Sequence, residues 1–252
     1  MFRILRHRFR CEAITPVFFP EGKAENVLRG MAGMLIPRVA GPELAAKLLR
    51  PEWPEGPSGY KTPPKPYHFR AFWLDKRRIF AQESFTFEVF QYAPELPVRE
   101  ILTRAIGILE HEGLGPGRGL ARLIDVETDE SLHSLAPGRE VGEVTLRLLT
   151  PVDVDLAFPV LLARLTERIH ALRACYQGLA PLPAPGGDGV EVVRDATVWV
   201  DRERLSTRTG QRYQTGGRVG EIVYAGPLTA AWPYLETGEW TGVGNGHYEV
   251  VG

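Results

Sequence analysis

The sequence predicts an α+β protein made of two ferredoxin-like βαββαβ units in tandem, an arrangement that is also called RRM-like. Three observations lead to this prediction. Segments with the two-residue period of a half-buried strand alternate with segments that have the 3.6-residue period of a helix. The order strand, helix, strand, strand, helix, strand occurs twice, and a turn-rich stretch separates the two halves. The repeat lies in the order of elements and not in the residues.

The first unit is expected to span residues 1–135. Its opening stretch, residues 2–14, places apolar side chains on one face and arginines on the other, as a strand with one buried face does. From Ala24 onward, apolar residues recur at helical spacing until Pro37, which is expected to interrupt the helix because proline lacks the backbone N–H. A second helical piece follows at Pro42–Leu49.

The rest of the first unit continues this order of elements. Residues 51–66 are so rich in proline and glycine that they are expected to form an exposed insertion. Two strands, a helix and a further strand are then expected at Tyr67–Leu74, Ser84–Tyr92, Val98–Glu112 and Leu120–Val126.

The second unit is expected to span residues 136–252 and to begin with a turn at Ala136–Gly138. A proline- and glycine-rich linker lies between its first helix and its second strand. The expected elements are a strand at Val141–Leu149, a helix at Phe158–Tyr176, strands at Val190–Val200 and Val219–Tyr224, a short helix at Leu228–Leu235 and a last strand at His247–Val251.

Composition narrows the classes of function. The chain of 252 residues has a formal net charge of −1, which argues against a generic nucleic-acid binder, yet arginines cluster near the N-terminus and again between Arg202 and Arg218. A polyanionic partner is therefore possible if these two basic segments meet in space. The two cysteines, Cys11 and Cys175, have neither disulfide nor zinc-site spacing. No apolar run is long enough to span a membrane, so a cytoplasmic protein is expected.

Glycine is unusually dense in EGLGPGRGLARL, residues 112–123. A dinucleotide-binding fingerprint has its glycines after a strand and before a helix, whereas these follow a helix and precede a strand. The GxxxxGK[ST] pattern of a nucleotide P-loop is absent from the sequence. The segment is therefore not a nucleotide-binding loop of either kind.

Four segments resemble the RAMP superfamily of CRISPR proteins, and in particular its repeat-processing endoribonucleases. GLGPGRGLARL is similar to the superfamily's glycine-rich start of a strand, and LRGMAGML at Leu28–Leu35 resembles the first helix of those endoribonucleases. RLSTRTGQRYQTGGRVGEIVY, residues 204–224, is similar to their glycine-rich arginine segment. The end of the chain, GEWTGVGNGHYEVV, resembles their C-terminal glycine loop and final strand.

The resemblance implies a metal-independent endoribonuclease that binds the repeat of a precursor CRISPR RNA and cuts it once. The cut leaves a 2′,3′-cyclic phosphate and a 5′-hydroxyl, and the protein stays on its product. The implied partners are the repeat hairpin and other subunits of a CRISPR ribonucleoprotein complex, with no cofactor, metal, membrane or direct contact with DNA. Two alternatives stay open: a catalytically silent RNA-binding subunit of the same superfamily, and a scaffold that does not bind RNA.

Candidate RNA-binding residues combine positive charge, an aromatic ring and the terminal glycines. Arginine and lysine neutralise phosphates, a tyrosine can stack on a base, and glycine exposes backbone N–H groups. We expect the N-terminal arginines and the C-terminal glycine loop to converge in one positively charged groove. The residues are Arg6, Arg8, Lys61, Lys65, Arg204, Arg208, Arg212, Tyr213, Arg218, Gly242, Gly244, Asn245 and Gly246.

Candidate catalytic residues are Arg38, Arg29 and His247. In the family that the sequence resembles, the proton-transfer residue commonly comes from the first helix, which here offers arginines and no histidine. Arginine stays protonated, but its planar fork stabilises negative charge on a phosphate. For Arg29, a helix-surface salt bridge or a buried structural role is an open alternative. His247 is expected to point to the polar side, where phosphate binding or capping of the loop is an alternative to catalysis.

Overall fold

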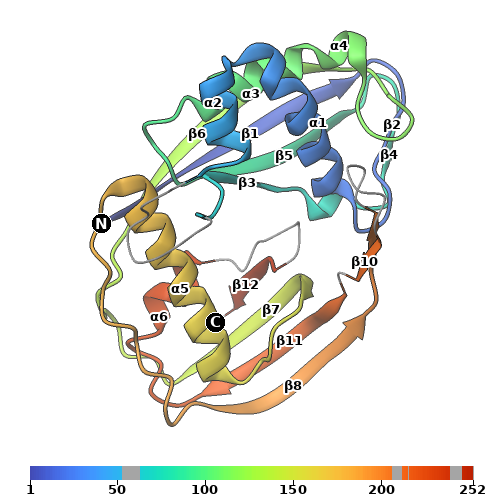
Figure 1. The fold of residues 1–252 in the computed structure, drawn as a ribbon. Coiled ribbons are helices and arrows are strands. Elements are labelled where there is room, and N and C mark those ends of the chain that lie inside the picture. The colour runs from blue at the N-terminus through green and yellow to red at the C-terminus, as the bar shows by residue number, and fades with distance from the viewer. Residues whose placement is uncertain (53–62, 206–211, 215, 239–245, 252) are drawn as a thin grey trace. The chain divides into compact units, whose positions relative to one another are not determined.

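The computed structural model describes residues 1–52, 63–205, 212–214, 216–238 and 246–251. The chain divides into two compact units (Figure 1). One unit contains Phe2–Leu132 together with Ala171–Leu179, and the other contains His133–His170 and Ala180–Gly252 together with Met1. Each unit has its own sheet and its own helices, and each is described separately below.

The first unit is built on an antiparallel sheet in the order β3-β5-β1-β6. The strands are β1 (Phe2–Ala13), β3 (Tyr67–Arg70), β5 (Ser84–Gln91) and β6 (Ala121–His133). In the register of β1 and β5, Phe9 lies opposite Phe87, and their rings stack with centroids 5.2 Å apart. Because alternate residues of a strand face opposite sides, this register places the apolar residues of both strands on one face.

Helices cover that apolar face (Figure 1). The two main helices, α1 (Ala24–Val39) and α3 (Val98–Gly107), bury their apolar stripes against it, and the shorter α2 (Pro42–Leu49) and α4 (Leu109–Glu112) lie beside them. Burial of this apolar area is the main source of the unit's stability. A 3₁₀ helix (Phe72–Leu74) and a small sheet of β2 (Val17–Phe18) and β4 (Arg78–Ile79) complete the unit.

The second unit repeats the same plan. Its antiparallel sheet has the order β12-β7-β11-β8, with α5 and α6 on one side (Figure 1). Numbered within each unit, both sheets therefore have the strand order fourth, first, third, second, which confirms the predicted tandem ferredoxin-like fold. The elements are β7 (Glu143–Val152), α5 (Phe158–Gln177), β8 (Glu191–Val200), a hairpin of β9 (Glu203–Leu205) and β10 (Arg212–Gln214), β11 (Gly217–Ala225), α6 (Trp232–Thr237) and β12 (Tyr248–Val251).

Three predicted boundaries were wrong. Helix α1 continues through Pro37 to Val39, because a proline in the last turn removes only one hydrogen bond of the ladder. The strand predicted over Tyr67–Leu74 ends at Arg70 and gives way to the 3₁₀ helix. Strand β6 runs to His133, well beyond the predicted end, because polar contacts with β1 hold its polar half and apolar alternation does not mark it.

Other elements also differ from their predicted bounds. The long helix predicted over Val98–Glu112 is divided into α3 and α4 at Ile108, and the last short helix begins at Trp232. The hairpin of β9 and β10 lies between the strands predicted at Val190–Val200 and Val219–Tyr224. Among the described residues, no helix combines the length and apolar character that crossing a membrane requires.

Candidate nucleic-acid interface

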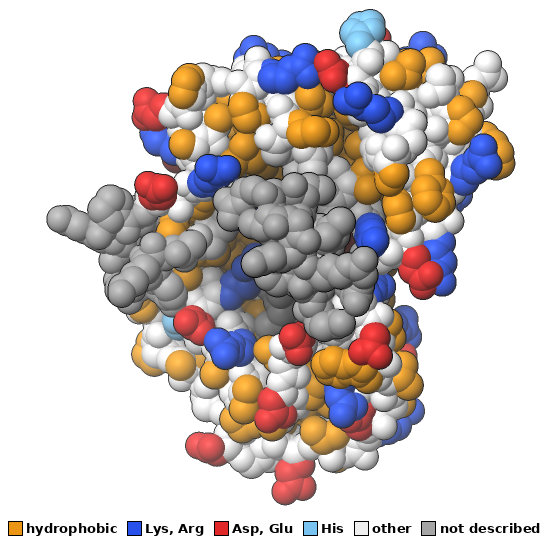
Figure 2. Space-filling view, turned by 45° about the vertical axis from the view of Figure 1, so that its right-hand side comes forward, with side chains coloured by type: hydrophobic (Ala, Val, Ile, Leu, Met, Phe, Trp, Pro, Cys, Tyr) orange, Lys and Arg blue, Asp and Glu red, His pale blue; other side chains and the backbone are white. Residues whose placement is uncertain are grey.

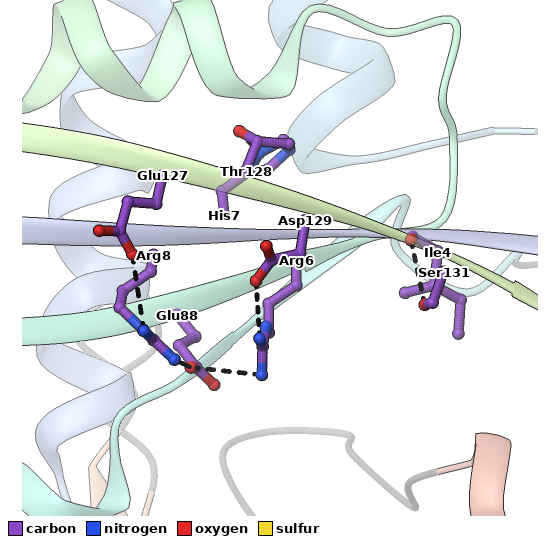
Figure 3. Close-up of polar contacts among 9 residues, drawn as sticks. All are labelled: Ile4, Arg6, His7, Arg8, Glu88, Glu127, Thr128, Asp129 and Ser131. Atoms are coloured by element: carbon purple, nitrogen blue, oxygen red, sulfur yellow. Dashed lines mark hydrogen bonds and ion pairs between the residues drawn. The ribbon is translucent and has the colours of Figure 1, made fainter.

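Arg6 and Arg8 of β1 lie on the sheet face opposite the helices and are paired with acids (Figure 3). Arg6 Nη2 lies 2.6 Å from Asp129 Oδ2, and Arg8 Nη1 lies 3.5 Å from Glu127 Oε2; both acids are on the neighbouring strand β6. On the other side, Glu88 Oε1 of β5 is 3.3 Å from Arg8 Nη2 and 3.9 Å from Arg6 Nη1. The two guanidinium groups are therefore held between three carboxylates.

This pairing changes the expectation for Arg6 and Arg8. The hydrogen bond to Asp129 raises the pKa of Arg6, and the same contact lowers the pKa of Asp129. Glu88 is nearly buried, whereas Asp129 and Glu127 are exposed, so water screens the outer contacts. An RNA phosphate would have to displace these carboxylates, and RNA binding by Arg6 and Arg8 stays a prediction.

Aromatic rings and a further arginine share this sheet face. The ring of His68 stacks on Phe90 at 5.1 Å, and the Tyr92 hydroxyl lies 3.0 Å from His68 Nδ1. The guanidinium of Arg70 lies 5.6 Å from the ring centre of Phe72 and 5.9 Å from that of Phe90. Cross-strand register brings these groups beside the β1 arginines, since His68 pairs with Phe90 and Phe90 with Arg6. In the sequence, the only sign of this arrangement is the two-residue spacing of His68 and Arg70, which places both on one side of their strand.

The glycine-rich segment between α4 and β6 is a tight turn. Leu114 and Gly119 exchange two backbone hydrogen bonds of 2.7 and 3.1 Å, and the N–H of Arg118 donates to the carbonyl of Gly115. A side chain at Gly113 would come within 2.1 Å of the Arg118 carbonyl oxygen. At Gly119 it would come within 2.3 Å of a neighbouring carbonyl oxygen, that of Pro16. These glycines therefore permit close approach of the backbone, and the turn uses its own N–H groups internally.

Arg38 stands in the last turn of α1, beside this glycine turn. Its Nη1 lies 3.0 Å from Glu112 Oε1, and the other oxygen of Glu112 lies 3.8 Å from Arg118 Nη2. All three side chains are exposed, and two positive charges share one negative charge. This cluster, Arg38–Glu112–Arg118, has an excess positive charge that is open to a phosphate.

Arg29 lies elsewhere on the same helix. Nine residues separate it from Arg38, which corresponds to about half a turn of rotation and about 13 Å along the axis, so the two side chains leave opposite sides of α1. Burial raises the pKa of Tyr67, and the charge of nearby Arg29 opposes that effect. The two arginines therefore do not lie side by side on the helix, and the closeness of Arg29 to the buried Tyr67 favours a structural role for Arg29.

His247 is completely buried, so the prediction that it points to the polar side was wrong. Its N–H donates to Thr150 Oγ1 at 2.9 Å, and its carbonyl accepts from the N–H groups of Leu149 and Thr150. These bonds hold the start of the last strand against β7. Gly246 before it has a φ of +94°, a conformation that favours glycine.

For the remaining predicted RNA-binding residues, the structure gives only their strand register or their exposure, and some lie outside the described residues. Arg204 lies opposite Tyr213 in the register of β9 and β10, and Arg212 lies opposite Leu205. Arg218 begins the exposed part of β11, and Lys65 is exposed at the base of the insertion. Outside the described residues lie Lys61, Arg208, Gly242, Gly244 and Asn245.

The predicted groove combines residues of both units, and it stays a prediction. On the face drawn in Figure 2, basic and acidic side chains are interspersed over the described surface. Affinity for a polyanion would therefore come from local clusters such as Arg38–Glu112–Arg118 and not from one uniform positive field.

Comparisons with known proteins show which solved structures share this fold. No protein-family model and no curated protein matches the chain. Among solved structures, a Cas6 protein in a product complex matches with a TM-score of 0.61 and 17% identity, covering 100% of both chains. A second Cas6 product complex matches with a TM-score of 0.57 and 18% identity over 99% of this chain and 100% of its own. A RAMP protein described as binding different RNA substrates matches with a TM-score of 0.52 and 13% identity, and the match covers 98% of this chain and 100% of that protein. From end to end, this chain has the tandem ferredoxin-like fold of Cas6 and RAMP proteins.

Proposed function

We propose that the protein binds the repeat of a precursor CRISPR RNA, cleaves it once and stays bound to the product. The observation that carries this proposal is the match over the whole chain to two Cas6 product complexes. Both units match and not only one, so the likeness extends to the whole tandem arrangement. Four sequence segments similar to the same superfamily lie in both halves of the chain and support the proposal independently.

The RNA would be held by clusters of arginines. The paired strands β9 and β10 carry Arg204 and Arg212, two cations that can contact phosphates of folded RNA. In the other unit, Arg38 and Arg118 share a single carboxylate partner. Each phosphate neutralised in this way releases counterions, so binding should weaken steeply as salt increases.

The cleavage step uses the RNA itself as the nucleophile. The 2′-hydroxyl oxygen attacks the adjacent phosphorus and loses its proton, the bond from phosphorus to the 5′-oxygen breaks, and that oxygen takes up a proton. The products are a 2′,3′-cyclic phosphate and a 5′-hydroxyl, and no external nucleophile is consumed. Arg38 would stabilise the negative charge that gathers on the phosphate oxygens, because guanidinium keeps its charge and donates two parallel hydrogen bonds.

The second candidate function is a silent RNA-binding subunit, and the burial of His7 and His247 favours it. His247 is buried, and His7 is buried with both ring nitrogens in hydrogen bonds, to Thr128 Oγ1 at 2.9 Å and Gln91 Oε1 at 2.8 Å. Neither ring stands ready to move a proton at a bound phosphate. A protein that depends on arginine alone would cut slowly or not at all.

One experiment separates these functions. The protein is incubated with a hairpin repeat RNA in excess EDTA, and the products are separated on a gel and tested for a cyclic phosphate end. A single cut with that end supports a metal-independent endoribonuclease. Binding without a cut supports the silent subunit, and absence of binding supports a scaffold. A cut that appears only when a divalent metal is restored would contradict the proposed chemistry.

A further inference from the structure

One exposed tryptophan stands out in the second unit. The side chain of Trp199 on β8 is 56% exposed, although tryptophan is usually covered in a folded protein. Its indole N–H donates to Asp201 Oδ1 at 2.8 Å, and this bond fixes the orientation of the ring. A large aromatic surface is thus held in one place, and fixing it on binding costs little further conformational entropy.

Arg218 lies directly across from this ring. In the register of β11 and β8, Arg218 pairs with Trp199, so the two side chains share one face of the sheet, on strands about 5 Å apart. Arg218 Nη1 lies 3.1 Å from Thr197 Oγ1 and 3.6 Å from Asp195 Oδ2. Among the described residues, these contacts engage only Nη1, which leaves Nη2 and Nε for an incoming group.

Thr197 and Asp195, the two residues that contact Arg218, are also hydrogen-bonded to each other. Thr197 donates to Asp195 Oδ1 through both its backbone N–H, at 2.8 Å, and its hydroxyl, at 2.6 Å. Those two bonds, with a smaller contribution from the charge of Arg218, lower the pKa of Asp195. The carboxylate therefore stays ionised at neutral pH and, together with Thr197, holds the guanidinium two residues along the strand from Trp199.

The surroundings of the ring favour a nucleic-acid base over a protein partner. Val198 is also exposed, but alternation along the strand turns it to the opposite face of the sheet. On the face of Trp199, the neighbours in register are Arg218, Thr197 and Gly220, which add no apolar side chain. A protein-docking patch needs contiguous apolar area, whereas an isolated ring beside a cation matches one base and one phosphate.

The position in the chain connects this pair with the proposed RNA contacts. Trp199 and Arg218 lie near the ends of β8 and β11 from which the hairpin of β9 and β10 projects. RNA that contacts the arginines of that hairpin would leave its next nucleotides within reach of the indole. Bases inside a helix are already stacked on each other, so the nucleotide that reaches Trp199 has to be unpaired.

We propose that Trp199 and Arg218 form a stacking platform that holds one unpaired nucleotide of the bound RNA, the base on the indole and a phosphate on the guanidinium. The proposal rests on the proposed function, because it adds a subsite to the same RNA-binding protein. Its chemistry requires a flat π-system and an anion and sets no demand for a particular base. The platform would therefore add affinity with little sequence preference.

The test measures the affinity of the full chain for a repeat hairpin with unpaired flanking nucleotides. Replacing Trp199→Ala should weaken binding about 10-fold, and Trp199→Phe should keep most of the affinity because a ring remains. The matched control is Val198→Ala, an exposed change on the same strand but on the opposite face, which should leave affinity unchanged. Thermal unfolding of each variant checks that the fold is intact.

A scan with abasic nucleotides makes the test specific. One unpaired position should exist where removing the base weakens binding to the unaltered protein but not to Trp199→Ala, because the two changes remove the same contact. If the unaltered protein binds the RNA and Trp199→Ala binds equally well, the platform is wrong and the proposed function stands. If the unaltered protein binds no repeat RNA, both fall. Loss of self-association without loss of RNA affinity would identify β8 as a protein interface and overturn the platform.

Discussion

The two units share one strand order but present different surfaces. In the first unit, Arg6 and Arg8 of β1 are neutralised by Glu88, Glu127 and Asp129 on neighbouring strands. In the second unit, strand β8 leaves a tryptophan beside Arg218 at the sheet surface. The comparison shows that the same topology supports either a closed network of charges or an open set of groups, depending on which residues the register brings together.

Their cores differ as well. The first sheet buries stacked aromatic rings, Phe9 on Phe87, under α1 and α3. The second unit buries leucines on both its sheet and its main helix, such as Leu146 of β7 and Leu165 of α5. The first unit thus combines a rigid core with a charge-paired sheet face, and we expect it to act mainly as the support for Arg38.

The largest expected effect is on the aromatic core. Replacing Phe9→Ala removes a fully buried ring and leaves a cavity, so the free energy of unfolding should fall by about 3–5 kcal/mol in urea denaturation. The matched change in the second unit, Leu146→Ala, should cost about 2–5 kcal/mol. A loss below about 1 kcal/mol for Phe9→Ala would mean that this ring does not support the first unit.

The next effect concerns catalysis. Replacing Arg38→Ala should slow cleavage about 100-fold and weaken RNA affinity by less than about 10-fold, because the guanidinium contacts a phosphate in the bound state but acts most strongly on charge that develops in the transition state. Rates are measured under single-turnover conditions with saturating protein.

The contrasting variant is in the second unit. Replacing Arg212→Ala should mainly weaken affinity and reduce the salt slope by about one ion, with little effect on the cleavage rate of the bound RNA. Arg164→Ala, an exposed helix arginine 3.9 Å from Glu167, serves as the neutral control. Equal and small effects of Arg38→Ala and Arg212→Ala would show that the candidate site is misplaced.

A smaller effect is the pH dependence of stability in the first unit. Burial lowers the pKa of His7, with a hydrogen bond to Gln91 opposing the shift. The unfolded chain therefore binds a proton at higher pH than the folded protein does. The stabilisation is complete above a pH of about 6.5 and is lost as the pH falls below it, with a slope of at most about 1.4 kcal/mol per pH unit from this group.

The measurement compares urea denaturation of the unaltered protein and His7→Gln between pH 7.5 and 5. The variant should be less stable at neutral pH, because it loses the contacts with Thr128 and Gln91, but its stability should fall less steeply with acid. Parallel curves for the two proteins would show that His7 contributes nothing to the pH dependence.

The smallest expected effect is on RNA affinity, when the exposed acids that pair with Arg6 and Arg8 of β1 are neutralised. Replacing Glu127→Gln together with Asp129→Asn releases Arg8 and Arg6 from their exposed partners, and RNA affinity should rise about 3-fold at low salt. The gain should vanish at high salt, where exposed charges are screened. No gain at low salt would place this sheet face away from the RNA, and the two units would then differ even more than their surfaces indicate.

The tandem fold could be predicted from the amino-acid sequence. Alternating and helical periods identify the six main elements of each unit because these periods record which side of each element is buried, and that depends on the neighbouring residues along the chain. The sequence also marked Arg38, at the end of the first helix, and the arginines of the glycine-rich segment at residues 204–224 as candidate cations, and their roles stay predictions. It misjudged the ends of α1 and β6, where Pro37 and a run of polar residues mimic a boundary.

The pairing of charged side chains could not be predicted from the sequence and is visible only in the folded protein. Nothing in residues 2–14 reveals that Arg6 faces Asp129, some 120 positions later, or that Trp199 stands opposite Arg218. The burial of His247 likewise depends on backbone bonds to the end of β7. Cross-strand register and packing bring together residues that are far apart in the sequence, whereas periodicity reports only on residues that are near.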